Sequence, residues 1–229
     1  MAYTAYAKWL RSGQLALATR MNLLDHQLTV LDGAEDAAGF ARPFAALVLA
    51  ELARADALKQ ELTPAQRNRL LVSAASYVGT VSDYRGFNDT EGWRHGVAHG
   101  ADLLMQLSRH PSLARADLLP ILDAVAARIA PDGEHFYVFG EPERLARPII
   151  FLAMRDVFDG PTWQQWLERI SSPKPFTGWN ETFSSRSGLA KRHNTKAFLL
   201  ALYVVAQETE NPALRRLLTP LRQALQSMD

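Results

Sequence analysis

Helical periodicity along nearly the whole chain is the feature that most constrains the fold. Apolar residues recur at the roughly 3.6-residue spacing of an amphipathic helix, and turn-forming residues separate the periodic segments. An alternating strand pattern is absent apart from a weak one at 135–139. The sequence predicts helices over 15–31, 43–59, 64–80, 92–108, 116–129, 140–158, 162–170, 188–208 and 211–226.

The lengths and spacing of these segments favour an all-α fold in a single domain, residues 1–229. Pairs of segments recur at about 45 residues, the spacing of a two-helix HEAT or armadillo repeat. We therefore expect antiparallel helix pairs stacked as a right-handed α-α superhelix with one concave face. A compact multi-helix bundle would give the same number of helices and is the alternative.

Charge and cysteine content narrow the partners and the chemistry. The chain has 25 basic and 24 acidic residues and no dense basic run, so nucleic acid is not an expected partner. It has no cysteine, which excludes disulfides, thiolate zinc sites and cysteine nucleophiles. The start of the chain does not have the pattern of a signal peptide. The longest apolar run, at 198–206, is about half of a membrane span, so we expect a cytoplasmic protein without membrane contact.

One segment, residues 171–188, breaks the helical pattern. It contains two prolines and two glycines, together with the aromatic residues Phe176, Trp179 and Phe183. Irregular loops of this length within a compact domain often serve as lids or binding loops. Two interpretations stay open: a surface loop held by its own aromatic residues, or a lid that packs over the pocket through Trp179.

The segment GWRHGVAHGAD contains the strongest candidate for a chemical site. On a continuous helix, His95, His99 and Asp102 would lie on one face. Histidines four residues apart are typical of helical metal sites, and Asp102 could complete a divalent-metal site or orient a histidine. A hydrogen-bonded structural network and a metal-free binding or catalytic site are the other interpretations. Gly96 and Gly100 suggest that another helix or a ligand approaches closely.

Other polar residues lie at the predicted helix ends. Arg42 precedes a proline at a helix start, and Asp83 and Arg85 occupy the turn before the histidine segment. Glu141 and Arg144 fall in the first turn of their helix, where a carboxylate is favoured whatever the function. Each residue taken separately is explained by local structure.

Four segments resemble one known family. The sequences ARPFAALVLAELARAD (41–56), DYRGF (83–87), GWRHGVAHGADLL (92–104) and GEPERLA (140–146) are similar, in this order, to the domain of unknown function 2785 family. Pro43 departs from the serine expected there. The resemblance implies a helical, HEAT-like bacterial protein and no assigned activity. It also implies that one motif set groups Arg42, Asp83, Arg85, His95, His99, Asp102, Glu141 and Arg144.

Two functions of different classes follow. The first is a helical-repeat protein that binds a peptide or small polar ligand in a pocket formed by this motif set and Trp179. The second is a hydrolase-like enzyme, with candidate catalytic residues His95, His99 and Glu141. It would use either a divalent metal on His95, His99 and Asp102 or a histidine base without metal. Both functions predict that His95, His99 and Asp102 converge with Asp83, Arg85, Glu141 and Arg144 on one shared pocket.

Overall fold

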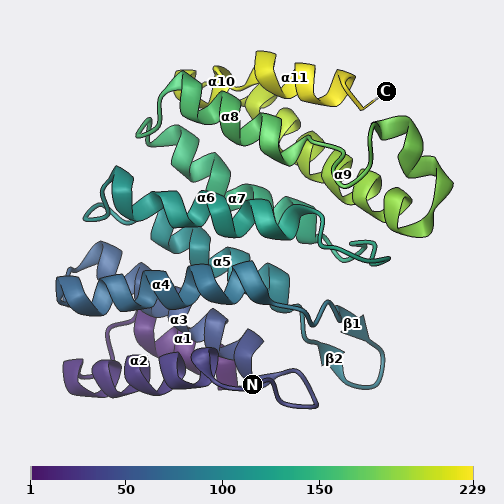
Figure 1. The fold of residues 1–229 in the computed structure, drawn as a ribbon. Helices are drawn as coiled ribbons and strands as arrows, with labels where there is room; N and C mark the ends of the chain where they lie inside the picture. Colours follow the sequence, from purple (N-terminus) through teal and green to yellow (C-terminus); the bar gives the residue numbers. More distant parts are fainter. Residues whose placement is uncertain (1, 229) are drawn as a thin grey trace.

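The computed structural model describes residues 2–228 and confirms the all-α class (Figure 1). Its elements are α1 (Ala2–Arg11), α2 (Leu17–Asp32), α3 (Ala41–Leu58), α4 (Pro64–Thr80), β1 (Phe87–Asn88), β2 (Gly92–Trp93), α5 (Gly96–Ser108), α6 (Arg115–Ile129), α7 (Glu141–Met154), α8 (Gly160–Ile170), the 3-10 helix η1 (Trp179–Ser184), α9 (Arg186–Glu208), α10 (Pro212–Arg215) and α11 (Leu218–Gln226). In the described part of the chain, no helix combines the length and apolar character needed to cross a bilayer.

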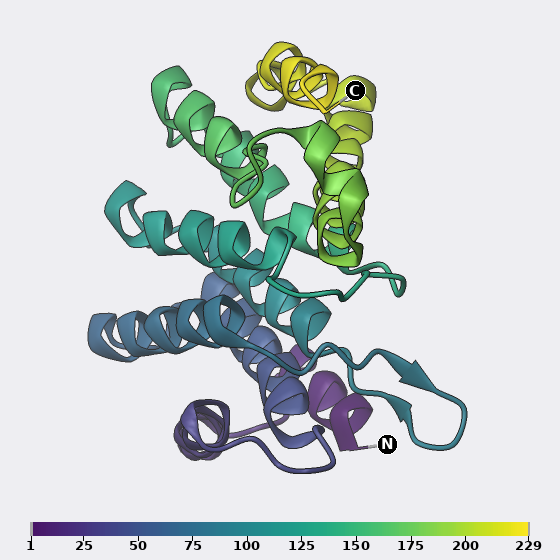
Figure 2. The same ribbon diagram turned by 45° about the vertical axis from the view of Figure 1, so that its right-hand side comes forward.

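The helices form two layers. Helices α1, α3, α5, α7 and α9 pack side by side in one layer, while α2, α4, α6, α8 and α11 form the other (Figure 2). The amphipathic pattern explains this arrangement, because each helix buries its apolar side between the layers. Leu24, Leu70, Leu104 and Phe198 are fully buried there.

The connections between the layers differ at the two ends of the stack. The segments 59–63, 109–114 and 155–159 are short turns. The segments 33–40, 81–95, 130–140 and 171–185 are longer, and they gather at the opposite end (Figure 1). The second of them carries an antiparallel hairpin in which Phe87 pairs with Trp93. The site is built at this end.

A buried polar network fixes one of the short-turn ends. The Asp56 carboxylate accepts hydrogen bonds from Arg67 Nε at 2.7 Å and from the backbone amides of Glu61 and Leu62. His110 Nδ1 accepts the Ser112 amide, so its Nε2 hydrogen donates to Asp56 at 2.9 Å. The network joins α3, α4 and the end of α5, and its residues were not singled out from the sequence.

Several sequence predictions need correction. The residues 135–139 form no strand, and the predicted helix over 211–226 is divided into α10 and α11. Helix α1 was not predicted. The histidine helix begins at Gly96 and not at Gly92, because the chain first makes the β1–β2 hairpin. The prediction of a close approach at Gly100 is correct: a Cβ there would lie 2.6 Å from Val78 Cγ2 of α4.

Candidate functional site

His95 has an uncommon backbone conformation. It stands directly before α5 with φ of 55°, in the left-handed region that residues other than glycine rarely adopt. This turn places the imidazole beneath the Trp93 indole, with ring centroids 4.7 Å apart and planes at 26°. His99 lies one turn along α5, 5.8 Å from His95 between ring centroids, and its ring also contacts Phe44. The two histidines therefore do lie together, although His95 is not helical.

Each imidazole has a buried nitrogen without a partner. His95 Nε2 and His99 Nδ1 make no hydrogen bond within residues 2–228. The His99 ring hydrogen-bonds the backbone of Pro43, which has only a carbonyl to offer. His99 Nε2–H must then be the donor, and Nδ1 carries a lone pair. The free nitrogen of His99 is therefore a hydrogen-bond acceptor.

Burial and positive charge keep both histidines neutral near pH 7. Burial, together with the Arg144 charge, lowers the pKa of His95 to about 4. Burial, with His95 and Arg144 nearby, lowers the pKa of His99 to about 3. The His95 Nε2 atom lies 3.8 Å from Glu141 Oε1, too far for a hydrogen bond. Burial raises the pKa of Glu141, while its other oxygen accepts the Phe139 amide at 2.9 Å.

Asp102 is held by arginines and not by the histidines. Arg144 donates to its Oδ2 at 2.7 Å and Arg147 to its Oδ1 at 3.4 Å. Burial raises the pKa of Asp102, and the two arginines oppose that effect. Both oxygens are thus engaged, which argues against the metal site predicted on His95, His99 and Asp102. Across residues 2–228, no three His, Asp or Glu side chains are arranged to hold a metal ion.

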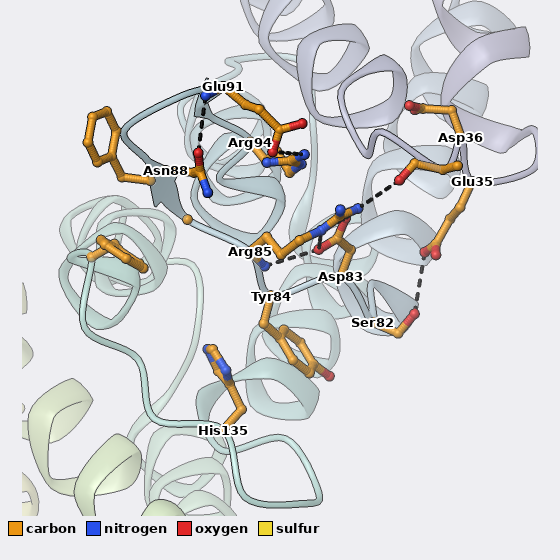
Figure 3. Close-up of a pocket in the computed structure, with 14 residues that line it drawn as sticks. Glu35, Asp36, Ser82, Asp83, Tyr84, Arg85, Asn88, Glu91, Arg94 and His135 are labelled. Atoms are coloured by element: carbon orange, nitrogen blue, oxygen red, sulfur yellow. Dashed lines mark hydrogen bonds and ion pairs between the residues drawn. The ribbon is translucent and has the colours of Figure 1, made fainter.

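A cavity of about 900 Å³ lies next to this group, at the end of the stack where the long connections gather (Figure 3). Three of those connections contribute its walls, and every lining residue lies outside the α-helices. The lining residues are Glu35, Asp36, Ala37, Ser82, Asp83, Tyr84, Arg85, Gly86, Phe87, Asn88, Glu91, Arg94, His135 and Phe139. The cavity therefore belongs to the loops, where binding residues are commonly found on a rigid scaffold.

Ion pairs and backbone contacts fix the polar wall. Arg85 donates to Asp83 through Nε at 2.8 Å and through Nη2 at 2.6 Å, and it also reaches the Ala37 carbonyl. Arg94 donates to Glu91 at 2.8 Å and contacts the Ala38 carbonyl. These contacts tie segment 33–40 to segment 81–95.

Aromatic rings form another part of the lining. Tyr84 stacks on His135 with centroids 5.0 Å apart, and the Tyr84 hydroxyl accepts a hydrogen bond from Arg128 at 2.8 Å. Burial lowers the pKa of His135. Phe139 packs edge to face against Trp93. Phe139 lines the cavity, and Trp93 stacks on His95, so these two rings form an aromatic partition beside the cavity.

The structure divides the predicted motif set into two groups. Asp83 and Arg85 line the cavity, and Arg42 lies beside it, where it pairs with Glu35 at 3.2 Å and stacks over Tyr77. The second group, His95, His99, Asp102, Glu141 and Arg144, lies behind the aromatic partition. None of the second group lines the cavity, so the cavity brings together only part of the predicted set.

Trp179 belongs to neither group. Its indole donates to the Ser171 carbonyl at 3.2 Å, and η1 packs against α9. The side chain is buried as part of the hydrophobic core and does not line the cavity, so it does not serve as a lid over it in this conformation. Segment 171–185 is nevertheless the fourth long connection at the same end of the stack (Figure 1).

Several cavity residues were missed by sequence reasoning. Glu35, Asn88, Glu91 and His135 lie in the irregular segments between predicted helices, and Arg94 lies where a helix was predicted but the β1–β2 hairpin ends. The regular alternation of long and short connections was the signal that could have found them, because long connections two helices apart must stack at the same end.

Comparison with known proteins gives one match. A family model described as "Protein of unknown function (DUF2785)" matches residues 28–204, which is 177 of the 229 residues. No curated protein and no solved structure matches the chain.

Proposed function

The chain belongs to the DUF2785 family, and we propose that it is a binding protein whose ligand occupies the loop-lined cavity. The ligand is a peptide segment or a small polar molecule. The single observation that carries the proposal is the cavity itself. Its volume of about 900 Å³ lies within the range of roughly 300–1,000 Å³ that is usual for ligand sites.

The construction of the walls supports binding without a large rearrangement. The Arg85 side chain is fixed by its ion pair with Asp83, and the Tyr84 hydroxyl is fixed by a hydrogen bond from Arg128. Groups fixed in this way lose little conformational entropy when a ligand binds. The lining combines polar and aromatic side chains, which suits a ligand with a polar group on a flat or apolar body.

The test is a ligand screen against the full chain. Pools of short peptides and polar metabolites would be screened by ligand-observed NMR, with the variant Ser82→Tyr beside the wild type. Ser82 is exposed and lines the cavity, so a tyrosine there would occupy the ligand volume without disturbing the core. The matched control is Gln164→Tyr, because Gln164 lines a separate cavity of about 560 Å³ near α8.

The proposal predicts hits that Ser82→Tyr loses and Gln164→Tyr keeps. Hits that both variants retain, or that only Gln164→Tyr loses, would contradict it. A screen in which no peptide or metabolite binds would also contradict the proposal that the cavity binds a ligand.

A second candidate, metal-free hydrolysis with a histidine base, is supported by the free nitrogens behind the partition. Neutral His95 and a buried Glu141 with a raised pKa lie 3.8 Å apart, and groups perturbed in this way cluster at catalytic sites. Access requires the hairpin to move, because the Trp93 ring covers His95. Hydrolysis of simple esters that is abolished in His95→Ala but kept in His135→Ala would favour this candidate over binding alone.

A further inference from the structure

We propose that the ligand presents a cationic group, a guanidinium or an ammonium, to the loop-lined cavity. The inference rests on the proposed binding function and names the chemical class of its ligand. It depends on the charge balance of the lining, on the ion pairs that the lining arginines already make, and on the aromatic rings in the same lining.

The cavity wall is acidic. The carboxylates of Glu35, Asp36, Asp83 and Glu91 outnumber the guanidinium groups of Arg85 and Arg94 in the lining, and counting Arg42, which pairs with Glu35 beside the cavity, the net charge is −1. His135 adds no positive charge near neutral pH, since burial lowers its pKa. A wall of one net sign attracts a ligand of the opposite sign and raises its local concentration.

The two arginines of the wall are already engaged. Arg85 makes a two-point contact with Asp83, and Arg94 pairs with Glu91 and a backbone carbonyl. An anionic ligand would have to displace these intramolecular carboxylates. A cation can instead bind a carboxylate oxygen that no arginine contacts, such as Oε2 of Glu35, which faces the cavity (Figure 3).

Glu35 is the most available acceptor. Its side chain is 46% exposed, and its contacts with Arg42 and Ser82 both use Oε1. The second oxygen can therefore accept a hydrogen bond from a ligand. Asp36 is placed beside it by the backbone amides of Phe40 and Ala41, which lower the pKa of its carboxyl group and keep it ionised.

The aromatic wall complements this acidic edge. Tyr84 and His135 stack with their planes at 29°, so His135 covers one face of the Tyr84 ring, and Arg128 fixes the Tyr84 hydroxyl. The face of a tyrosine ring attracts a cation, and a planar guanidinium also stacks on it. A cationic group could thus contact carboxylates on one side and an aromatic face on the other.

The experiment compares three small probes by two-dimensional amide NMR at low ionic strength. Methylguanidinium is the cation, N-methylurea is its uncharged counterpart of nearly equal shape, and acetate is the anion. We expect methylguanidinium to shift the amide signals of Tyr84, Arg85 and Asn88. Its affinity should exceed that of N-methylurea by about tenfold and should fall as salt is added.

Charge variants test the same point. Glu35→Gln should weaken methylguanidinium binding by about two- to fivefold, the effect of one exposed charge. Glu168→Gln on α8, which pairs with Gln164 away from the cavity, is the control and should change nothing. Both glutamates are exposed, so neither variant threatens folding.

The outcomes separate this inference from the function on which it rests. Equal or tighter cavity binding of N-methylurea or acetate would overturn the cationic ligand while leaving a binding cavity. Absence of any amide shift around the cavity with all three probes and with the peptide pools would overturn both. Shifts caused by methylguanidinium that Glu35→Gln leaves unchanged would place the cation elsewhere and would also overturn the inference.

Discussion

Phe139 lies directly on Gly86. A Cβ atom on Gly86 would stand 2.0 Å from Cδ2 of the Phe139 ring, closer than any side chain can approach. Phe139 also packs edge to face on Trp93, which in turn stacks on His95. This contact sets the position of the partition between the cavity and the histidine pair.

Gly86→Ala should therefore move the partition. The Phe139 ring borders the cavity and can turn into it, so we expect ligand binding to be lost at a stability cost of about 1 kcal/mol. Calorimetric titration and thermal unfolding would measure the two effects. Gly178→Ala is the control, since no heavy atom lies within 4 Å of the added Cβ. Unchanged binding in Gly86→Ala would show that the partition does not shape the cavity.

Gly100→Ala should destabilise the fold itself. The added methyl group would meet Val78 Cγ2 at 2.6 Å and Tyr77 Cε1 at 3.0 Å in the contact between α4 and α5. Overpacking of this kind costs about 1–3 kcal/mol of unfolding free energy. Urea denaturation would measure the loss, with Gly160→Ala as a control at a position with open space. Equal stability of the two variants would contradict the close approach of the helices.

The histidine pair should make stability depend on pH. The folded pKa values, about 4 for His95 and about 3 for His99, lie below the ordinary value of about 6.5. At pH values between the folded and the ordinary pKa values, the unfolded chain binds more protons than the folded chain. The free energy of unfolding should therefore fall as the pH decreases below about 6.5, and it should keep falling toward the folded values.

The variant His99→Gln isolates one part of this effect. From about pH 7 to about pH 5, each depressed histidine contributes a loss of about 2 kcal/mol, so the variant should show a smaller loss by that amount. Glu141 and Asp102, whose pKa values are raised, act in the opposite direction in both proteins. Urea denaturation at the two pH values is the measurement, and parallel losses in both proteins would contradict it.

Arg144 should influence the titration of both histidines. Its positive charge is one cause of their lowered pKa values, so Arg144→Met should raise both. Arg147→Met is the matched control: Arg147 also contacts Asp102, at 3.4 Å, but is not a cause of either shift. Imidazole NMR titration would follow the rings. Equal pKa values in the Arg144 variant and the wild type would refute the electrostatic account.

Helix positions were largely predictable, because each helix shows its own apolar period and its ends show local signals. Thr63 and Pro64 predicted the start of α4, and the structure has a capping box there with Gln66. The error at Gly92 has a physical cause. The residues 92–95 suit a helix by pattern, but pairing of Phe87 with Trp93 extends the chain and turns it at His95.

The candidate site was predictable only in part. His95 and His99 are four residues apart in the sequence, and they lie together in space although His95 precedes α5 in a left-handed conformation. The cavity depends on contacts that no local pattern records, such as Arg85 with Ala37 and Tyr84 with His135, which are about 50 residues apart. These contacts form because the long connections stack on one another at one end of the fold. That stacking exists only once the two helix layers have assembled.

The most direct test of the central claim is a crystal structure of the protein grown with millimolar acetyl-arginine amide. The account predicts electron density for the guanidinium between the Glu35 carboxylate and the Tyr84 ring, with Asp83 still bound to Arg85. An empty cavity, or density confined to the separate cavity beside Trp163, would contradict the claim that the loop-lined cavity is the binding site.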